Sequence, residues 1–298
     1  MHARVGSSIL ELWQRSGARS LVVVGTGKNV GKTVTLRAIY RACVEAELAC
    51  GVTSIGRDGE AVDVTEAVAK PRIWLEPQTV VATARDVLPA SPASEILDVT
   101  PCATAAGALT YARVRVAAHY ELIGPPSASA LRATIGNLLT YAPWVLVDGA
   151  IDRVAALAGG ADAIVVACGA AAARTRDEAI DDVRALVLRL HVPRVNAADE
   201  TLRIDGALTP ALAARLIERR ERRTIVVRDP TQIVLAGRAA RHAFERLTIR
   251  CERPLNVIAA TVASIGRERT FDPEDFAQAV ARATGLPTFD VYAAERAA

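Results

Sequence analysis

The residues with the clearest chemical meaning form one glycine-containing stretch, Gly25-Thr26-Gly27-Lys28-Asn29-Val30-Gly31-Lys32-Thr33-Val34. In a phosphate-binding loop, free backbone N–H groups converge on an anion, a lysine reaches the β- and γ-phosphates, and a hydroxyl holds Mg²⁺. Lys32 and Thr33 have the types and the order that this chemistry requires. The spacing therefore predicts that this stretch binds ATP and Mg²⁺.

One position departs from the usual pattern, because its first glycine would fall at Thr26. Lysine usage supports the prediction nevertheless. Only three of the 36 Lys and Arg residues are lysines, and two of these lie in the loop. Arginine cannot replace lysine at a tight phosphate site, since its fork is broad and planar. A plain glycine-rich turn is the structural alternative. A dinucleotide fingerprint starting at Gly25 is another, although it does not explain Lys32.

Further polar residues could complete a catalytic site. Lys28 would add a second cation at the γ-phosphate, beside the catalytic Lys32. Asp148 follows the apolar run Trp144–Val147, where the carboxylate that helps to hold Mg²⁺ is expected. Asp58 follows the second predicted strand and is a further metal candidate. Each carboxylate could instead belong to a solvated turn.

Lys70 and Arg72 flank a proline and would present two cations from an extended segment. An acidic ligand or partner is one interpretation of this pair. Ordinary solvated side chains are the other.

The elements that must position these residues alternate between strands and helices. Leu21–Val24 is an apolar run typical of a strand buried on both faces. Gly31-Lys32-Thr33 is expected to open a helix, and a second strand is expected at Cys50–Ser54. This alternation predicts an α/β fold with a doubly wound, mainly parallel sheet and helices on both faces. We expect an NTPase domain over residues 1–200, and a C-terminal α/β segment over 201–298 that could continue it.

Several segments have weaker patterns. Residues 79–100 mix features of short helix and loop. Tyr111–Ala117 alternates arginine with apolar residues, which predicts a strand with one wet face, and Tyr120–Ile123 is its expected hairpin partner. A short strand is expected at Val192–Val195. Thr209 and Asp272 each precede a proline and should begin helices.

Composition excludes several classes of protein. The 298 residues are 51% hydrophobic, so the chain can bury a large core. A net charge of +3 gives no reason to expect a nucleic-acid partner. The five cysteines are scattered without a metal-binding spacing, which suits a reducing cytoplasm. No stretch predicts a membrane span, and we expect a homodimer.

The glycine-containing loop resembles that of dethiobiotin synthetase, which has Gly-Thr before its variable residues and Val-Gly-Lys-Thr after them. That family belongs to the SIMIBI class of P-loop NTPases, with the nitrogenase iron protein and the Min and Par ATPases. The chain departs from dethiobiotin synthetase where a Lys-Pro pair should follow the second strand. Thr53–Arg57 stands there without a lysine. The residues that would hold a diamine carbamate are therefore missing.

A wider likeness is to the ATPase subunit of the lysine 5,6-aminomutase reactivase. The similar segments are Ser54–Glu60, Lys70–Ile73, Gly124–Ser127, Asp148–Arg153, Gly206–Thr209 and Phe271–Pro273. That family is thought to work with a second ATPase subunit in restoring cobalamin-dependent aminomutases. The resemblance implies an ATP hydrolase that acts as a switch or chaperone on a protein partner and is slow without it.

Two functions thus remain open from the sequence. The first is the ATP-driven switch just described. The second is an ATP-dependent ligase or kinase for a small molecule, related to dethiobiotin synthetase. The missing lysine after the second strand favours the first. The chain has no Asn/Thr-Lys-x-Asp motif for guanine.

Overall fold

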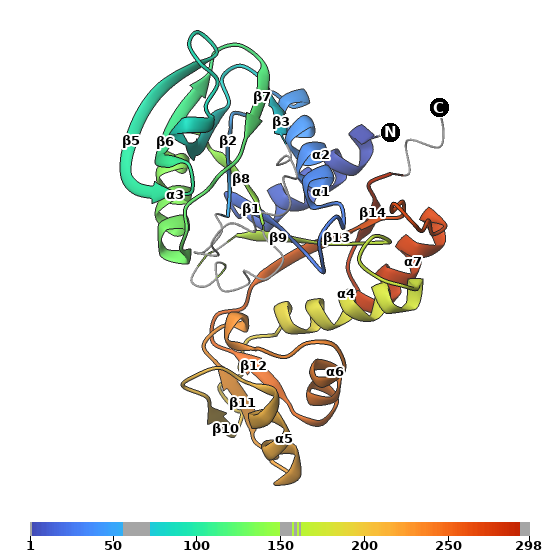
Figure 1. Ribbon diagram of the computed structural model, residues 1–298. Coiled ribbons are helices and arrows are strands. Elements are labelled where there is room, and N and C mark those ends of the chain that lie inside the picture. Colours follow the sequence, from blue (N-terminus) through green and yellow to red (C-terminus); the bar gives the residue numbers. More distant parts are fainter. Residues whose placement is uncertain (1, 56–71, 150–156, 158–159, 161, 293–298) are drawn as a thin grey trace. The chain divides into compact units, whose positions relative to one another are not determined.

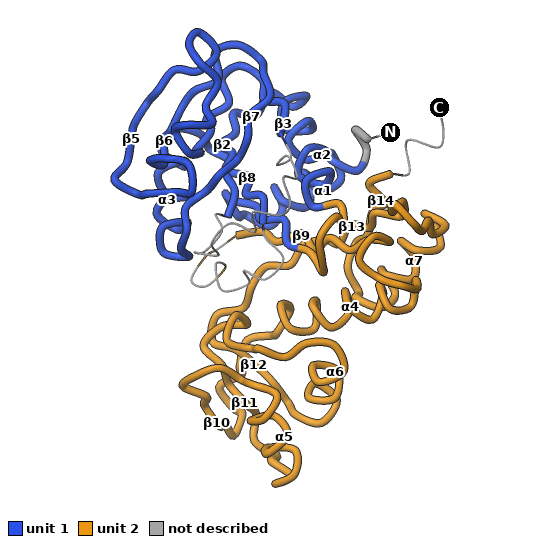
Figure 2. Tube along the Cα trace, viewed as in Figure 1, with its two compact units in different colours: residues 1–24, 32–156 blue, residues 25–31, 157–298 orange. Residues whose placement is uncertain are grey.

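The computed structural model describes the chain except for residues 1, 56–71, 150–156, 158–159, 161 and 293–298 (Figure 1). Two compact units make up the fold (Figure 2). The first contains Met1–Val24 and Lys32–Ala156, and the second contains Gly25–Gly31 and Leu157–Ala298. The boundary expected between residues 200 and 201 lies inside the second unit. No helix in the described ranges is both long enough and apolar enough to cross a bilayer.

The first unit is built on strands that follow the hydrogen-bonded order β1-β8-β2-β4-β6-β5. The pairs from β1 to β4 are parallel, and β6 and β5 add an antiparallel edge. The elements are α1 (His2–Ser16), β1 (Ser20–Gly25), α2 (Lys32–Glu45), β2 (Cys50–Ser54), β3 (Arg72–Leu75), β4 (Val80–Ala84), η1 (Arg85–Val87), β5 (Ser94–Thr104), β6 (Gly107–Val114), β7 (Ala118–Glu121), α3 (Ala128–Tyr141) and β8 (Trp144–Asp148).

Helices cover both faces of this sheet, as two neighbouring residues of β2 show. The Cys50 thiol lies beside Cys43 of α2. A Cβ atom on Gly51 would lie 3.2 Å from the Cβ atom of Leu138 in α3. Because successive strand residues point to opposite faces, α2 and α3 lie on opposite sides. The structure thus confirms the predicted α/β class, with a mainly parallel sheet flanked by helices.

Helix α1 packs against α2 at very short range. A Cβ atom on Gly6 would lie 2.1 Å from the carbonyl oxygen of Ala38, so only glycine fits at this crossing. Trp13 is fully buried, and its ring meets that of Trp144 edge to face at 4.9 Å. The close contact between α1 and α2 fixes one side of α2, the helix that follows the glycine-containing loop.

Two predictions for the first unit need correction. Residues 79–100 contain the predicted short helix and loop, as η1 and the residues after it, but also the strand β4 and most of β5, which were not predicted. All five residues of β4 are buried, so its small side chains sit inside the sheet. The strand expected at Tyr120–Ile123 is β7, and it pairs antiparallel with β3 and not with β6. Its partner lies far away in sequence, which local patterns do not reveal.

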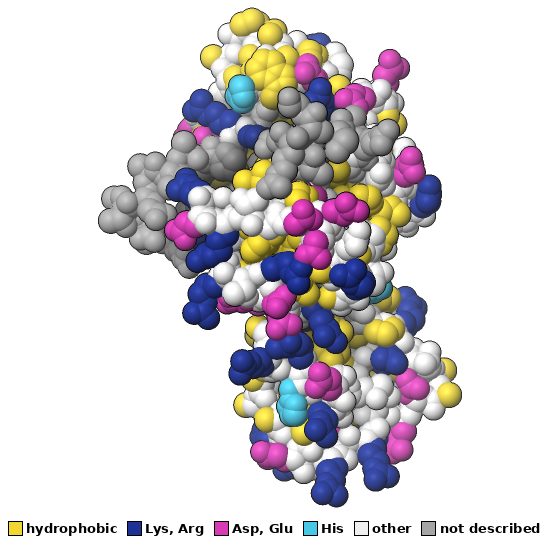
Figure 3. Space-filling view, turned by 90° about the vertical axis from the view of Figure 1, so that its right-hand side faces the viewer, with side chains coloured by type: hydrophobic (Ala, Val, Ile, Leu, Met, Phe, Trp, Pro, Cys, Tyr) yellow, Lys and Arg dark blue, Asp and Glu magenta, His cyan; other side chains and the backbone are white. Residues whose placement is uncertain are grey.

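The second unit contains two sets of parallel strands, in the orders β14-β13-β9 and β10-β11-β12. Helix α4 contacts β9, α6 and α7. Basic and acidic side chains are interspersed over the face drawn in Figure 3. The elements are β9 (Ala163–Gly169), α4 (Arg176–Leu190), β10 (Thr201–Arg203), α5 (Pro210–Glu218), β11 (Thr224–Val227), η3 (Pro230–Gln232), α6 (Gly237–Arg246), β12 (Ile249–Cys251), β13 (Asn256–Ala263), α7 (Pro273–Thr284) and β14 (Thr288–Asp290).

Helix caps in this unit follow the sequence closely. Thr209 accepts a hydrogen bond from the backbone N–H of Leu212, and Asp272 accepts one from Asp275. The expected strand at Val192–Val195 is reduced to an isolated bridge between Arg194 and Cys251. Strands β10 and β12, each of three residues, have too little sequence to show a period.

Candidate phosphate-binding site

The loop between β1 and α2 turns sharply at two left-handed residues. Asn29 has φ 58° and Gly31 has φ 89°. Asparagine and glycine are the residues that adopt this conformation most readily. The Thr26 N–H donates to the carbonyl of Ala167 at 3.0 Å. The chain then enters α2 at Lys32, as the sequence predicts.

The loop glycines have a packing role of their own within the second unit. A Cβ atom on Gly27 would lie 2.7 Å from the Cβ atom of Ala172, and one on Gly31 would lie 2.9 Å from that of Ala263. Val30 is 1% exposed and belongs to the core. The loop therefore packs against the ends of β9 and β13, and its glycines are required for this packing even without a ligand.

The first unit brings Thr33 to Asp148. The Thr33 hydroxyl donates to the carboxylate Oδ2 at 3.3 Å. The register explains the approach, since β8 runs parallel to β1 and places Asp148 level with Val23, two residues before the loop. Gly149 then donates its N–H to the Val23 carbonyl at 3.0 Å. The candidate carboxylate thus lies at the strand end that the sequence predicts.

The charge of Asp148 is finely balanced. Burial raises the pKa of its carboxyl group to about 6, against the opposing effects of Lys32, then of the Thr33 hydroxyl, then of Arg37. A bound divalent cation would favour the charged form more strongly than these groups do. Thr33 and Asp148 offer the hard oxygen ligands that Mg²⁺ prefers, so the residues fit a magnesium site.

The loop residues also fit a bound phosphate. Helix α2 begins at Lys32 and has 14 residues, so its first N–H groups and its dipole favour an anion there. Lys28 is exposed in the loop, as a side chain that meets a ligand would be. Its action on a γ-phosphate stays a prediction. Asp58 and Lys70 lie outside the described residues, so their predicted roles also stay predictions.

Sequence reasoning missed two residues around Asp148. Arg37 lies one helical turn after Thr33 and acts electrostatically on Asp148. Ser54 pairs with Asp148 in the sheet, and its hydroxyl bonds to Leu122 and Gly124. The four-residue spacing from Thr33 could have indicated Arg37, since residues four apart share a helix face. Nothing in the local sequence indicates the partners of Ser54.

A metal site made only of protein carboxylates, histidines or cysteines is not present in the described ranges, where no three such side chains gather. A magnesium ion at Thr33 and Asp148 would therefore need phosphate or water oxygens as further ligands.

Comparisons with known protein families, with curated protein sequences and with solved structures found no match to this chain.

Proposed function

We propose that the chain is a Mg²⁺-dependent ATP hydrolase of the P-loop type. The observation that carries this proposal is the contact between the Thr33 hydroxyl and the Asp148 carboxylate, made at the start of the helix that follows a glycine-containing loop. Two hard oxygen ligands that meet beside Lys32 suit a metal ion bridging to phosphate.

Each residue would have a distinct task. The loop N–H groups and the Lys32 ammonium would bind the β- and γ-phosphates. Thr33 and Asp148 would hold Mg²⁺, which neutralises phosphate charge when bound. Lys28 would face the γ-phosphate and favour the charge that develops there. The described site offers no carboxylate placed to activate a water molecule besides Asp148, which is consistent with slow turnover by the isolated chain.

We further propose that this ATPase serves as a switch or chaperone for a protein partner in the cytoplasm. The likeness to the aminomutase reactivase subunit supports a cobalamin-dependent aminomutase, or a second ATPase subunit, as that partner. No described residue points instead to a metabolite beside the loop, as a small-molecule ligase or kinase would require.

Calorimetry of the full chain with ATP, in the presence and absence of Mg²⁺, tests the first part of the proposal. We expect one ATP site that is weakened when Mg²⁺ is chelated. ATP turnover measured alone and with a candidate aminomutase tests the second part, where we expect stimulation. ATP binding without any stimulation would retain the P-loop assignment and reject that partner.

A further inference from the structure

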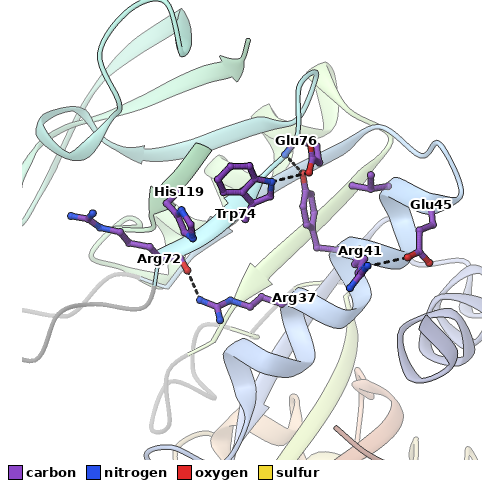
Figure 4. A pocket seen from close by; sticks show the side chains of 9 residues that line it. Arg37, Arg41, Glu45, Arg72, Trp74, Glu76 and His119 are labelled. Carbon is purple, nitrogen blue, oxygen red and sulfur yellow. Dashed lines mark hydrogen bonds and ion pairs between the residues drawn. The ribbon is translucent and has the colours of Figure 1, made fainter. Parts of the chain in front are cut away.

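A second binding site is indicated by a groove on the first unit. The groove has a volume of about 570 Å³ and lies between α2 and the two-stranded sheet β3–β7 (Figure 4). Arg37, Tyr40 and Val44 line it from α2, Arg72 and Trp74 from β3, and His119 from β7. Its residues come from three separate parts of the sequence.

The aromatic side of the groove is held in place before any ligand arrives. The Trp74 ring meets the His119 ring edge to face at 5.0 Å, and its Nε1 donates to Glu76 at 2.8 Å. The Tyr40 hydroxyl bonds to Thr79 at 2.6 Å and accepts from the Glu76 N–H at 2.7 Å. Trp74 nevertheless remains 48% exposed. A large aromatic surface is thus fixed by its neighbours but not covered by them.

The charged side of the groove has more basic than acidic side chains. Arg41 is paired with Glu45 at 3.2 Å. Arg37 donates to the backbone carbonyl of Arg72. The Arg72 side chain is itself exposed and has no acidic partner among the described residues. A carboxylate is the group that an arginine fork binds best, through two parallel hydrogen bonds. The groove is therefore complementary to an acidic group next to an apolar one.

We propose that this groove binds an acidic segment of a partner protein, with a carboxylate on Arg72 and an apolar or aromatic side chain against Trp74. Tryptophan, tyrosine and arginine are the residues that dominate binding energy at protein interfaces. The exposed rim argues against a small metabolite, because a site for one normally encloses most of its ligand. Here Trp74 and Val44 are 48% and 36% exposed, which suits a chain lying along the surface.

The groove also has a direct link to the candidate phosphate site. Arg37 reaches the backbone of Arg72 in the groove and also acts on the charge of Asp148. Thr33 and Arg37 share one face of α2. The binding site itself does not depend on the proposed ATPase, so it can be tested without nucleotide.

The experiment uses the full-length chain and a fluorescent random copolymer of glutamate and tyrosine as the probe. Fluorescence anisotropy measures its binding to wild type, Arg72→Glu, Trp74→Ala and Arg85→Glu. Arg85 is an exposed arginine of η1 in the same unit, outside the groove, so its variant is the matched charge control. We expect both groove variants to bind at least about tenfold more weakly, the scale of one charge-assisted contact, and the control to bind as wild type does.

Polyglutamate without tyrosine should bind more weakly to wild type, and Trp74→Ala should remove that difference. Circular dichroism establishes that each variant is folded, and Arg72→Gln and Trp74→Leu replace any that is not. The proposal is overturned if wild type does not bind the copolymer, or if the groove variants bind it as well as wild type. An equal loss in Arg85→Glu would overturn it in favour of general charge attraction. Displacement of the copolymer by equimolar indole-3-acetate would overturn it in favour of a small ligand.

Discussion

The Thr33 hydroxyl lies 3.3 Å from the Asp148 carboxylate, although 115 positions separate the two residues in the chain. Thr33 begins the helix after the loop, and Asp148 ends a strand that runs parallel to β1. The loop sequence and the sheet topology thus converge on one pair of oxygen-bearing side chains.

Replacing Lys32 by alanine should abolish nucleotide binding with little loss of stability. Lys32 is half-buried in the first turn of α2 and is not a core residue, so its ammonium would serve the ligand more than the core. Calorimetry with ATP measures binding, and thermal unfolding measures stability. Arg41→Ala, in the same helix but directed to Glu45, is the control and should bind ATP normally. Unchanged ATP affinity in Lys32→Ala would reject the phosphate-binding loop.

Replacing Asp148 by asparagine should retain ATP binding but weaken its dependence on Mg²⁺ and lower hydrolysis. The substitution keeps the shape and removes the charge that a hard cation needs. Titration of Mg²⁺ at fixed ATP, followed by phosphate release, measures both effects. Wild-type hydrolysis in the variant would mean that Asp148 is only a turn residue.

Asp148 should also give the metal-free protein a characteristic pH dependence. The folded chain raises its pKa from 3.8 to about 6, so the folded state holds this proton more tightly than the unfolded state. The contribution of this carboxyl group to the stability of the fold is therefore complete at low pH and is lost as the pH rises from about 4 to about 6. Because one pKa unit corresponds to roughly 1.4 kcal/mol, the loss of stability is at most about 3 kcal/mol.

Denaturant unfolding of the metal-free chain across this pH range measures the effect. Asp148→Asn should lack this component, while Asp98→Asn, on an exposed position of β5, should follow the wild-type curve. Identical curves for wild type and Asp148→Asn would contradict the raised pKa. Added Mg²⁺ and nucleotide should flatten the wild-type curve above pH 6, because the cation favours the charged carboxylate.

Replacing Lys28 by alanine should leave ADP affinity near wild type and lower ATP hydrolysis by about tenfold or more, the scale of one lost charge-assisted contact. An ammonium facing the γ-phosphate would act on charge that develops during transfer, so turnover should suffer more than binding. Lys28→Arg should not restore hydrolysis, because its fork approaches phosphate differently. Equal losses of ADP and ATP affinity would indicate general attraction instead.

Diaminopelargonic acid should not be a substrate. The lysine that dethiobiotin synthetases place after the second strand has no counterpart here, where β2 ends in Thr53 and Ser54. Both hydroxyls are already used, by the Ala82 carbonyl and by Leu122 with Gly124. Dethiobiotin formed from ATP, bicarbonate and the diamine would establish the ligase function and reject the switch.

Local chemistry explains why much of the fold could be predicted. Helix α4 begins at Arg176, because Thr175 caps its first turn by accepting from the Glu178 N–H, and such a cap is visible in the sequence. The buried strands β1, β8 and β9 are continuous apolar runs, and such runs are visible without any partner. Asp148 lies at the predicted strand end because parallel strands end at a common edge, and its role stays a prediction.

The failures share a different cause. Strands β3 and β7 pair with each other although they lie far apart in the sequence. Short alternating segments do not reveal which partner such strands choose. The groove beside Trp74 depends on that pairing, so no local pattern indicated it. Arg37 was missed for a related reason, since its importance comes from Asp148 and Arg72, which are distant in the chain.

The crossing at Gly6 has a consequence for the entropy of ligand binding. Helix α2 is held between α1, which approaches within contact of Ala38, and strand β8. Its first turn, with Lys32 and Thr33, therefore takes its place when the chain folds. The cost of ordering that turn therefore falls on folding, and would not fall on the binding of phosphate at the proposed site. A side chain larger than hydrogen at position 6, which precedes Lys32 by 26 residues, would loosen this arrangement and weaken the proposed phosphate binding without touching the ligand.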